Sequence, residues 1–462
     1  MTASRQILTV AQMRGAEEAL MAGGIGVDEL MQRAGQGAAD YIWRVAGPLR
    51  RVTVLTGPGN NGGDGWVIAE AIRRRGGRVV VVPACAPRSA AAVRARDLYL
   101  GEIAGAEAAG EVLVDCLFGT GLTRGLEAGD LALLRGLAER HGYRVAVDLP
   151  SGVETDTGAM LSEGLPEYQL TIALGAWKRA HFLMPAAARM GALRLVEIGC
   201  GAVMGAGAVI GRPVLRAPAA DAHKYRRGML GIVAGAMPGA ALLAARAAQG
   251  AGAGYVKILS HGPLVAPFDR LAAPADLVVA RADFSDDRLS ALLIGPGLGR
   301  DAGAHFAVAE ALGAGRAVVV DADALMVLPK GLGGMIATPH EGELLALERH
   351  YGLSGAGDKV VRALALAGAS GMVIVAKGPD TVVAAPDGRW AAAERASSWL
   401  STAGTGDVLA GTIASRLACG VEAFVAACEG GWLHGAAARM TLPPFSAGEL
   451  AKAVASAYRA CL

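Results

Sequence analysis

Gly57-Pro58-Gly59-Asn60-Asn61-Gly62-Gly63-Asp64-Gly65 follows the apolar run Arg51–Thr56 and precedes a helical pattern from Trp66 to Arg75. This order predicts a strand, a glycine loop and a helix. Five glycines in nine positions let the backbone approach a ligand, and amide donors at a helix N-terminus favour phosphate or another anion. The Asn and Asp side chains suit a hydroxylated ligand or a cation. The spacing fits neither a P-loop nor a clean dinucleotide fingerprint.

The rest of the first half alternates apolar strands with helical segments, which predicts a parallel, doubly wound α/β sheet. Two amphipathic helices, one opening at Thr9 and one from Gly26 to Ala46, come first. They would cover a sheet or a partner subunit, and we expect a homo-oligomer. The predicted strands are Val52–Thr56, Val79–Pro83, Val112–Asp115, Arg144–Asp148, Leu170–Ala173 and Leu193–Glu197.

The length and net charge of the chain indicate how many domains to expect and argue against several classes of protein. A chain of 462 residues is too long for one typical core, so two domains are expected. A net charge of +2 gives no electrostatic case for nucleic acid or a membrane surface. Neither a signal-peptide core in Met1–Gln6 nor a run of about 20 apolar residues is visible, so we expect a cytoplasmic protein. The six scattered cysteines are interpreted as reduced core residues.

Three loops of the first half follow a strand end directly, where ligands bind in open α/β sheets. They are the opening stretch, Asp115–Gly125 and Asp148–Val153, and each carries an aspartate. A single strand-end aspartate is also typical of a helix N-cap. Three of them in glycine-rich surroundings favour carboxylates that converge on one crevice.

These motifs resemble a known family. Asn60–Asp64, Asp115 with Phe118–Gly121, and Asp148–Gly152 together look like the N-terminal epimerase domain of the NAD(P)H-hydrate repair proteins. Gln12-Met13-Arg14 and Leu30–Gly35 match that family as well. The resemblance covers nearly all of residues 1–212 and implies a Rossmann-like doubly wound domain.

The periodic pattern breaks between Ile210 and Asp221, where Gly211–Pro218 has neither helical nor strand period. We therefore place the domain boundary here, with one domain over residues 1–212 and a second over residues 213–462. Further strand-and-helix units follow, with strands at Leu230–Ala234, Val256–Leu259, Leu292–Ile294, Ala317–Val320, Met335–Thr338 and Met372–Ala376.

The second half carries its most informative motif near the C-terminus, where Ser401–Gly411 opens a long apolar helix. The amides of Gly404-Thr405-Gly406 lie at the helix start, where they can hold a phosphoryl group as charge develops on it. Asp407 is placed to accept a proton from a hydroxyl that attacks phosphorus. The alternative is that Asp407 only complements the helix dipole.

This loop belongs to a larger set of motifs. With Gly295–Gly299, Thr338–Glu343 and Lys377–Thr381 it resembles the ribokinase-like domain of the same repair proteins, the ADP-dependent (S)-NAD(P)H-hydrate dehydratase. The similarity spans about residues 218–460. The chain thus looks like the fused bifunctional repair enzyme of bacteria, acting on the hydrates NADHX and NADPHX.

In the first domain the resemblance implies a potassium ion, K⁺, held by the side chains of Asn61, Asp115 and Ser151. Asp148 is the candidate acid/base group near the hydrated carbon of the nicotinamide ring. Lys178 could steady a developing negative charge or be a solvated surface residue. The substrate would lie against Asn60, Asn61, Gly62, Gly63 and Asp64, and against Gly119, Thr120, Gly121, Leu122, Thr123, Arg124 and Gly125.

In the second domain Asp407 would deprotonate the C6 hydroxyl of the (S)-hydrate, which attacks the terminal phosphate of ADP. Loss of phosphate would then regenerate NAD(P)H and leave AMP. Any magnesium, Mg²⁺, would bind mainly through the nucleotide phosphates. His340, which the resemblance assigns to the substrate, could instead cap the helix that follows it. The resemblance assigns substrate contacts to Ala240, Gly299, His340 and Asp407, and nucleotide contacts to Lys377, Gly378, Pro379, Asp380, Thr381 and Gly406.

Rival functions remain at this point. The second domain could be a vitamin or sugar kinase of the ribokinase superfamily, with the first domain as a binding module. A kinase would accumulate phosphorylated acceptor, whereas the dehydratase would yield the absorbance of NAD(P)H and free phosphate. If the first domain were purely non-catalytic, we would expect its site residues to be replaced. Here Asn61, Asp115, Asp148 and Ser151 are all present, which argues against that alternative.

Overall fold

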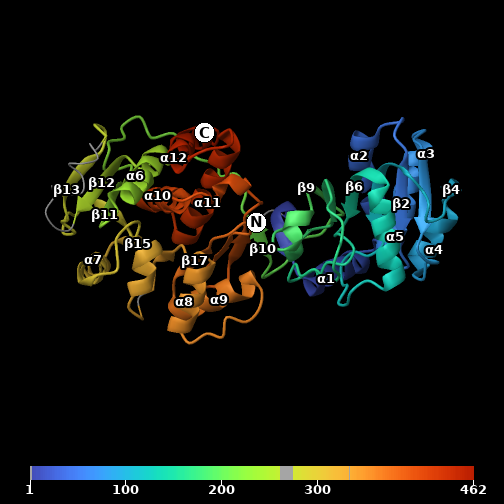
Figure 1. Ribbon diagram of the computed structural model, residues 1–462, viewed down its shortest axis with the longest axis horizontal. Coiled ribbons are helices and arrows are strands. Elements are labelled where there is room, and N and C mark those ends of the chain that lie inside the picture. Colours follow the sequence, from blue (N-terminus) through green and yellow to red (C-terminus); the bar gives the residue numbers. More distant parts are fainter. Residues whose placement is uncertain (1–2, 261–273, 332) are drawn as a thin grey trace. The chain divides into compact units, whose positions relative to one another are not determined.

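The computed structural model describes residues 3–260, 274–331 and 333–462, so Met1 and Thr2 of the N-terminal stretch lie outside it. The chain divides into two compact units, unit 1 over Met1–Ala208 and unit 2 over Val209–Leu462. In Figure 1 unit 1 runs from blue to green and unit 2 from green to red. Each unit is an α/β fold built on a largely parallel sheet, as predicted.

Unit 1 contains a seven-stranded sheet in the order β4-β3-β2-β5-β6-β7-β9, and every neighbouring pair is parallel. Its six long strands are the predicted ones. Strands such as β2 and β7 are buried on both faces and therefore read as continuous apolar runs. The short edge strand β4 was not predicted. The bounds are β2 Val52–Thr56, β3 Val79–Pro83, β4 Glu102–Ile103, β5 Gly110–Cys116, β6 His141–Val147, β7 Leu170–Leu174 and β9 Ala192–Val196.

Helices cover both faces of this sheet, which confirms the doubly wound architecture. Val54 and Val114 belong to the core shared with α2 and α3, whereas Leu55 and Leu113 belong to the core shared with α5. Alternate residues of each strand thus supply two cores. The helices are α1 Val10–Ala22, α2 Val27–Ala46, α3 Asn60–Arg74, α4 Ala90–Asp97 and α5 Ala128–Glu139.

The strand order reverses between β2 and β5, which lie side by side at the centre of the sheet. Connections leave these two strands in opposite directions, so their carboxyl ends open a crevice. A separate small ladder joins β1 (Gln6–Leu8) to β8 (Trp177–Lys178) in parallel and to β10 (Gly207–Val209) in antiparallel. This ladder brings Lys178, which belongs to β8, to the end of unit 1 where the crevice opens.

Unit 2 contains strands in the order β13-β12-β11-β14-β15-β16-β17-β18-β19. The pairs from β13 to β17 are parallel, and the last two pairs are antiparallel. All six predicted strands are present. The bounds are β11 Met229–Ala234, β12 Tyr255–Ser260, β13 Val278–Arg281, β14 Leu289–Ile294, β15 Ala317–Val320, β16 Ile336–Ala337, β17 Val373–Ala376, β18 Val382–Ala384 and β19 Trp390–Ala392.

Four helices of unit 2, α6, α10, α11 and α12, pack together over one buried cluster of mostly small side chains. Alanine and glycine allow this close approach, and α10 lies against β14 and β15. Among the described residues, no helix has the length and apolarity needed to cross a membrane. The helices are α6 Pro238–Gly250, α7 Ala302–Gly313, α8 Glu341–His350, α9 Lys359–Ser370, α10 Thr405–Ala418, α11 Ala423–Met440 and α12 Ala447–Arg459.

Candidate active sites

The glycine-rich stretch after β2 differs from its prediction in where its helix begins. Helix α3 starts at Asn60 rather than Trp66, so Asn60–Gly65 form its first turns. A Cβ atom at Gly62 would lie 2.0 Å from the carbonyl oxygen of Gly57, and one at Gly65 would lie 2.8 Å from Cβ of Cys116. The glycines therefore allow close packing at the start of α3, and Asn60, Asn61 and Asp64 of this helix face a cavity.

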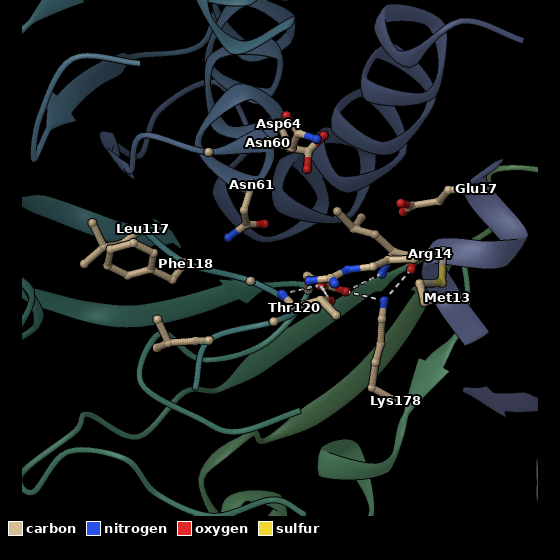
Figure 2. Close-up of a pocket in the computed structure, with 16 residues that line it drawn as sticks. Met13, Arg14, Glu17, Asn60, Asn61, Asp64, Leu117, Phe118, Thr120 and Lys178 are labelled. Atoms are coloured by element: carbon tan, nitrogen blue, oxygen red, sulfur yellow. Dashed lines mark hydrogen bonds and ion pairs between the residues drawn. The ribbon is translucent and has the colours of Figure 1, made fainter. Parts of the chain in front are cut away.

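That cavity, of about 390 Å³, lies at the carboxyl ends of the central strands of unit 1. Figure 2 shows Asn61 and Asp64 on one side, Lys178 reaching in from the opposite side, and Thr120 between them. A Cβ atom at Gly119 would lie 3.1 Å from Cγ of Asn61 and 3.2 Å from Oδ2 of Asp148. The lining residues are Met13, Arg14, Glu17, Gly59, Asn60, Asn61, Asp64, Leu117, Phe118, Gly119, Thr120, Gly121, Leu122, Asp148, Leu174 and Lys178.

The cavity brings together Asp148, which was also predicted to contact the substrate, and seven of the twelve other predicted substrate contacts of unit 1, and it leaves five outside. Gly62 and Gly63 are buried inside α3. Thr123, Arg124 and Gly125 come after the cavity-lining part of their loop, and Arg124 forms an exposed ion pair with Glu127. A substrate contact at any of these five stays a prediction.

Asp148 lies at the centre of the polar part of the cavity. Its backbone has φ of +65°, a conformation that few residues other than glycine adopt, directly after β6. Oδ2 accepts hydrogen bonds from both the backbone N–H and the hydroxyl of Thr120, and Oδ1 forms an ion pair with Lys178. Burial alone would raise the pKa of Asp148, but Lys178 and Thr120 outweigh it and hold that pKa below its usual value. These contacts thus favour the ionised form of the carboxylate.

Lys178 is buried, with only 1% of its side chain exposed, so the surface alternative considered for it is wrong. Its Nζ donates to Asp148 and, at 2.6 Å, to the carbonyl oxygen of Leu174. A signal in the sequence could have found it, because Lys178 is the only lysine within residues 1–208. Every other cationic position there except the histidines is an arginine, which cannot exchange a proton near neutral pH.

Two further carboxyl groups line the cavity, and their pKa values are shifted in the opposite direction to that of Asp148. Burial raises the pKa of Asp64 well above its usual value, and the negative charges of Asp148 and Glu17 add to this effect. Burial also raises the pKa of Glu17. Glu17 and Arg14, three residues apart on α1, were not predicted as site residues. The cavity therefore combines a carboxyl group whose pKa is lowered, Asp148, with two whose pKa is raised, an arrangement suited to acid/base chemistry.

Of the three residues predicted to hold potassium, Asn61 lines the cavity, whereas Asp115 and Ser151 are buried and do not line it. Asp115 is fully buried and accepts hydrogen bonds from Oγ of Ser151 at 2.7 Å and from the hydroxyl of Tyr168 at 2.5 Å. By contrast, the amide of Asn61 is buried with neither its oxygen nor its nitrogen hydrogen-bonded. Such an amide needs a partner. No group of three or more His, Cys, Asp or Glu suited to a metal occurs in the described parts of the chain.

In unit 2 the predicted phosphoryl loop is followed by α10. Gly404 precedes the helix with φ of +92°, and Asp407 lies in its first turn. Burial raises the pKa of Asp407 to about 6, and the negative charge of Asp321 adds to it while Lys377 opposes it. A carboxyl group with this pKa can act as a general base near neutral pH.

Lys377, predicted as a nucleotide contact, lies beside this helix start. Its Nζ is 2.6 Å from Oδ1 of Asp321 at the end of β15 and 4.0 Å from Glu343. A Cβ atom at Gly406 would lie 3.6 Å from the same Nζ. The fold therefore brings Lys377, Gly406, Asp407 and the unpredicted Asp321 together at the carboxyl ends of the parallel strands.

The other predicted residues of unit 2 occupy neighbouring loops. Gly378 and Thr381 form one hydrogen-bonded turn, with Pro379 inside it, and Asp380 is ion-paired with Lys359. Gly299 donates its N–H to Asp323 at 3.0 Å. The loop before it reaches α6, because a Cβ atom at Gly297 would lie 3.1 Å from Cβ of Ala240.

His340 has the capping geometry that was considered as an alternative for it. Its Nδ1 accepts the N–H groups of Gly342 and Glu343 at the start of α8. The ring is 62% exposed, so the cap does not exclude a ligand. The predicted substrate contact stays a prediction.

The comparisons with known proteins cover both units. The family model described as YjeF-related protein N-terminus matches residues 27–180, and the one described as NAD(P)H-hydrate dehydratase matches residues 230–458. The bifunctional NAD(P)H-hydrate repair enzyme Nnr of Salinibacter ruber is 32% identical, over 94% of this chain and 91% of that protein. Its counterpart in Synechocystis is 30% identical, over 90% and 86%.

A solved structure matches one unit. The ADP/ATP-dependent NAD(P)H-hydrate dehydratase of Bacillus subtilis, co-crystallised with ATP and Mg²⁺, is 29% identical over 54% of this chain and 95% of that one, with a TM-score of 0.47. The full-length relatives, which share both halves of the sequence, support the repair enzyme over a lone kinase with a binding module. This chain therefore belongs to the family of bifunctional NAD(P)H-hydrate repair enzymes.

Proposed function

We propose that unit 1 interconverts the R and S epimers of hydrated NADH and NADPH, and that unit 2 dehydrates the S epimer at the expense of ADP. The observation that carries this proposal is Asp407 in the first turn of α10, with a pKa of about 6 and Lys377 beside the same turn. A base, an anion-binding helix start and a cation together suit phosphoryl transfer to a hydroxyl.

In unit 2 Asp407 takes the proton of the C6 hydroxyl as that oxygen attacks the terminal phosphorus of ADP. The bond from that phosphorus to the bridging oxygen breaks, and AMP leaves. Lys377 and the amides at the start of α10 stabilise the charge that develops on the phosphoryl oxygens. Loss of phosphate and a ring proton then restores the double bond of the dihydronicotinamide, because phosphate is a far better leaving group than hydroxide.

The nucleotide would lie along Lys377–Thr381 and Gly406, and the hydrate near Ala240, Gly299 and His340. The described residues offer no cluster of carboxylates for a metal, so Mg²⁺ would be held mainly through the phosphates of the nucleotide. There it would neutralise phosphate charge. The supporting observation is that two acidic side chains near the loop are already ion-paired, Asp380 with Lys359 and Asp321 with Lys377.

In unit 1 the ionised Asp148 exchanges a proton with the substrate, and the Lys178 cation stabilises negative charge beside it. The protonated form of Asp64, favoured by burial, can donate a proton on the other side of the cavity. Either ring opening or loss of hydroxide at the hydrated carbon needs such transfers. The first turn of α3 and residues 119–122 would hold the substrate.

A potassium ion fits the unsatisfied amide of Asn61. Asn61, Asp115 and Ser151 would hold it through hard oxygen atoms, which suit an alkali cation better than a transition metal. There the cation would supply positive charge near the substrate. Thermal unfolding tests this assignment: potassium chloride should raise the Tm relative to choline chloride, and Asn61→Ala should remove the difference. An equal Tm in both salts would contradict it.

The function itself is tested by incubating purified protein with mixed hydrate epimers and ADP while the absorbance of the reduced cofactor is followed. We expect complete recovery of reduced cofactor together with one AMP and one phosphate for each molecule repaired. Recovery of the S portion alone would leave the dehydratase and remove the epimerase. An accumulating phosphorylated product would favour the kinase alternative.

A further inference from the structure

Helix α11 contributes a buried histidine to the start of α10. His434 is 9% exposed, and its Nε2 lies 3.0 Å from the carbonyl oxygen of Thr405, the first residue of α10. A carbonyl oxygen only accepts hydrogen bonds, so Nε2 carries the proton and donates. No step of the proposed reaction uses this side chain, and His434 was not among the predicted site residues.

The atom that His434 holds belongs to the peptide group between Thr405 and Gly406. A trans peptide is planar, and its C=O and N–H point in opposite directions. Fixing the carbonyl of Thr405 therefore fixes the direction of the N–H of Gly406. That N–H is one of the first four of the helix, which have no partner within the helix and point out of its N-terminus.

The side chain of Thr405 holds the same turn through two further contacts. Oγ1 of Thr405 donates to the carbonyl oxygens of Leu400 at 2.8 Å and Thr402 at 2.9 Å. These bonds fix the side chain of Thr405 but leave its carbonyl oxygen to α10 and His434. The imidazole is thus the contact from outside the helix that sets the tilt of this peptide.

The surroundings keep the imidazole neutral and its donor in place. Burial lowers the pKa of His434 to about 4, and the positive charge of Lys377 adds to this effect. Lys377 also lies beside Gly406, so the histidine, the lysine and the amide belong to one corner of unit 2.

We propose that His434 is a positioning residue of unit 2, whose Nε2–H holds the carbonyl of Thr405 and thereby aims the N–H of Gly406 at a phosphate of ADP. The inference rests on the proposed function, since it assumes that ADP binds at the start of α10. His434 itself contacts neither the nucleotide nor the hydrate.

The test compares His434→Gln with His434→Asn in the full chain. The amide nitrogen of Gln can reach the position of Nε2, whereas that of Asn is too short. Both replacements are polar and both place an amide in the same pocket, so we expect them to change the stability of the fold by similar amounts. The control is His141→Gln, because His141 is buried in unit 1 with its Nε2 2.8 Å from Oγ1 of Thr53.

For His434→Asn we expect the Kd and KM for ADP to rise several-fold and kcat to fall by roughly tenfold or more, since a misaimed donor loses most of its effect. The KM for the hydrate should stay unchanged. His434→Gln should lie within about twofold of the wild type, and His141→Gln should leave all ADP constants unaltered. A protein that is merely loosened would instead lose kcat at constant KM for both substrates.

Wild-type ADP constants in His434→Asn would overturn the inference. So would equal losses in the Asn and Gln variants, since the reach of the donor would then be irrelevant. A wild-type chain that binds ADP but performs no dehydration would overturn the proposed function alone. The Kd values for ADP would then still test whether His434 directs the N–H of Gly406. A wild-type chain that binds no ADP would overturn both.

Discussion

At the scale of single residues, the pKa of Asp407 makes the rate of unit 2 depend on pH. The carboxyl group accepts a proton only when ionised, and its pKa is raised to about 6 by burial and by Asp321. The kcat/KM for ADP-dependent dehydration should therefore fall as pH drops through about 6. Asp321→Asn removes the neighbouring negative charge and releases Lys377 from its ion pair, and both changes lower the pKa of Asp407.

The acid limb of the Asp321→Asn profile should accordingly move below that of the wild type. Asp301→Asn serves as the control, because Asp301 caps the start of α7 and Asn is an equally good cap. Its profile should match the wild type. An unmoved acid limb in Asp321→Asn would mean that a group other than Asp407 titrates there.

A second residue-scale prediction concerns the ion pair of unit 1. Lys178→Met removes the cation that holds the pKa of Asp148 low, and burial then raises that pKa, so the carboxyl group takes up a proton. Interconversion of the R and S hydrates at pH 7 should fall on the order of a hundredfold or more. Chromatographic separation of the epimers over time measures this rate.

The same substitution should lower the free energy of unfolding by roughly 3 kcal/mol, because it leaves Asp148 buried without its partner. Adding Asp148→Asn to Lys178→Met removes the unpaired carboxyl group. The double variant should therefore be more stable than Lys178→Met alone. Simple additivity of the two single losses would argue against a coupled pair.

At the scale of elements, the two ends of α10 offer a matched comparison. Gly404 has φ of +92° and Gly420 has φ of +82°, so alanine is strained at both positions. A Cβ atom at Gly404 would also lie 2.7 Å from Cδ1 of Leu243, whereas one at Gly420 would meet nothing within 4 Å. Gly404→Ala should displace the phosphoryl loop and raise the Kd for ADP about tenfold or more.

Gly420→Ala should cost about 1 kcal/mol of stability without changing the Kd for ADP. Calorimetric titration of both variants with ADP makes the comparison. Equal ADP affinities in the two variants would show that the start of α10 does not bind the nucleotide.

The elements themselves were largely predictable from the sequence. Strands such as Val52–Thr56 and Ala317–Val320 are buried on both faces, so their apolar runs reveal them directly. The start of α3 was misplaced because its glycines disfavour a helix locally, whereas in the fold Gly63 packs against Met31 and Gly65 against Thr56 and Cys116. Local sequence does not contain these contacts.

The polar partners of each site were less predictable, because they depend on side chains far apart in the chain. Lys178 is buried through its bond to Asp148, thirty residues earlier, and His434 through the carbonyl of Thr405. A buried charge or imidazole looks in sequence like a surface residue. Predicted contacts such as Thr123–Gly125 and Gly62 failed to line the cavity for a related reason, since a motif marks a loop but not which of its side chains face inward.

At the scale of the whole molecule, the proposed function places separate active residues in the two units and gives them one shared substrate pool. In that proposal the hydrate forms as two epimers, and unit 2 uses only the S form. Asp407→Asn should therefore abolish recovery of reduced cofactor from both epimers, since the R form gains nothing from being converted. Asp148→Asn should abolish recovery of the R form while the S form is still dehydrated at the wild-type rate. Absorbance at the reduced-cofactor band, followed for each purified epimer, separates these outcomes.

Mixing Asp407→Asn with Asp148→Asn gives a further test, because each variant supplies the active unit that is inactive in the other. The released S epimer can diffuse from one chain to another, so an equimolar mixture should recover reduced cofactor from the R form. The rate should rise with total protein until one step limits it. A mixture that stays inactive, although each variant keeps its intact activity, would mean that the S epimer must pass between units of the same chain. Fusion of the two units would then serve transfer of the substrate.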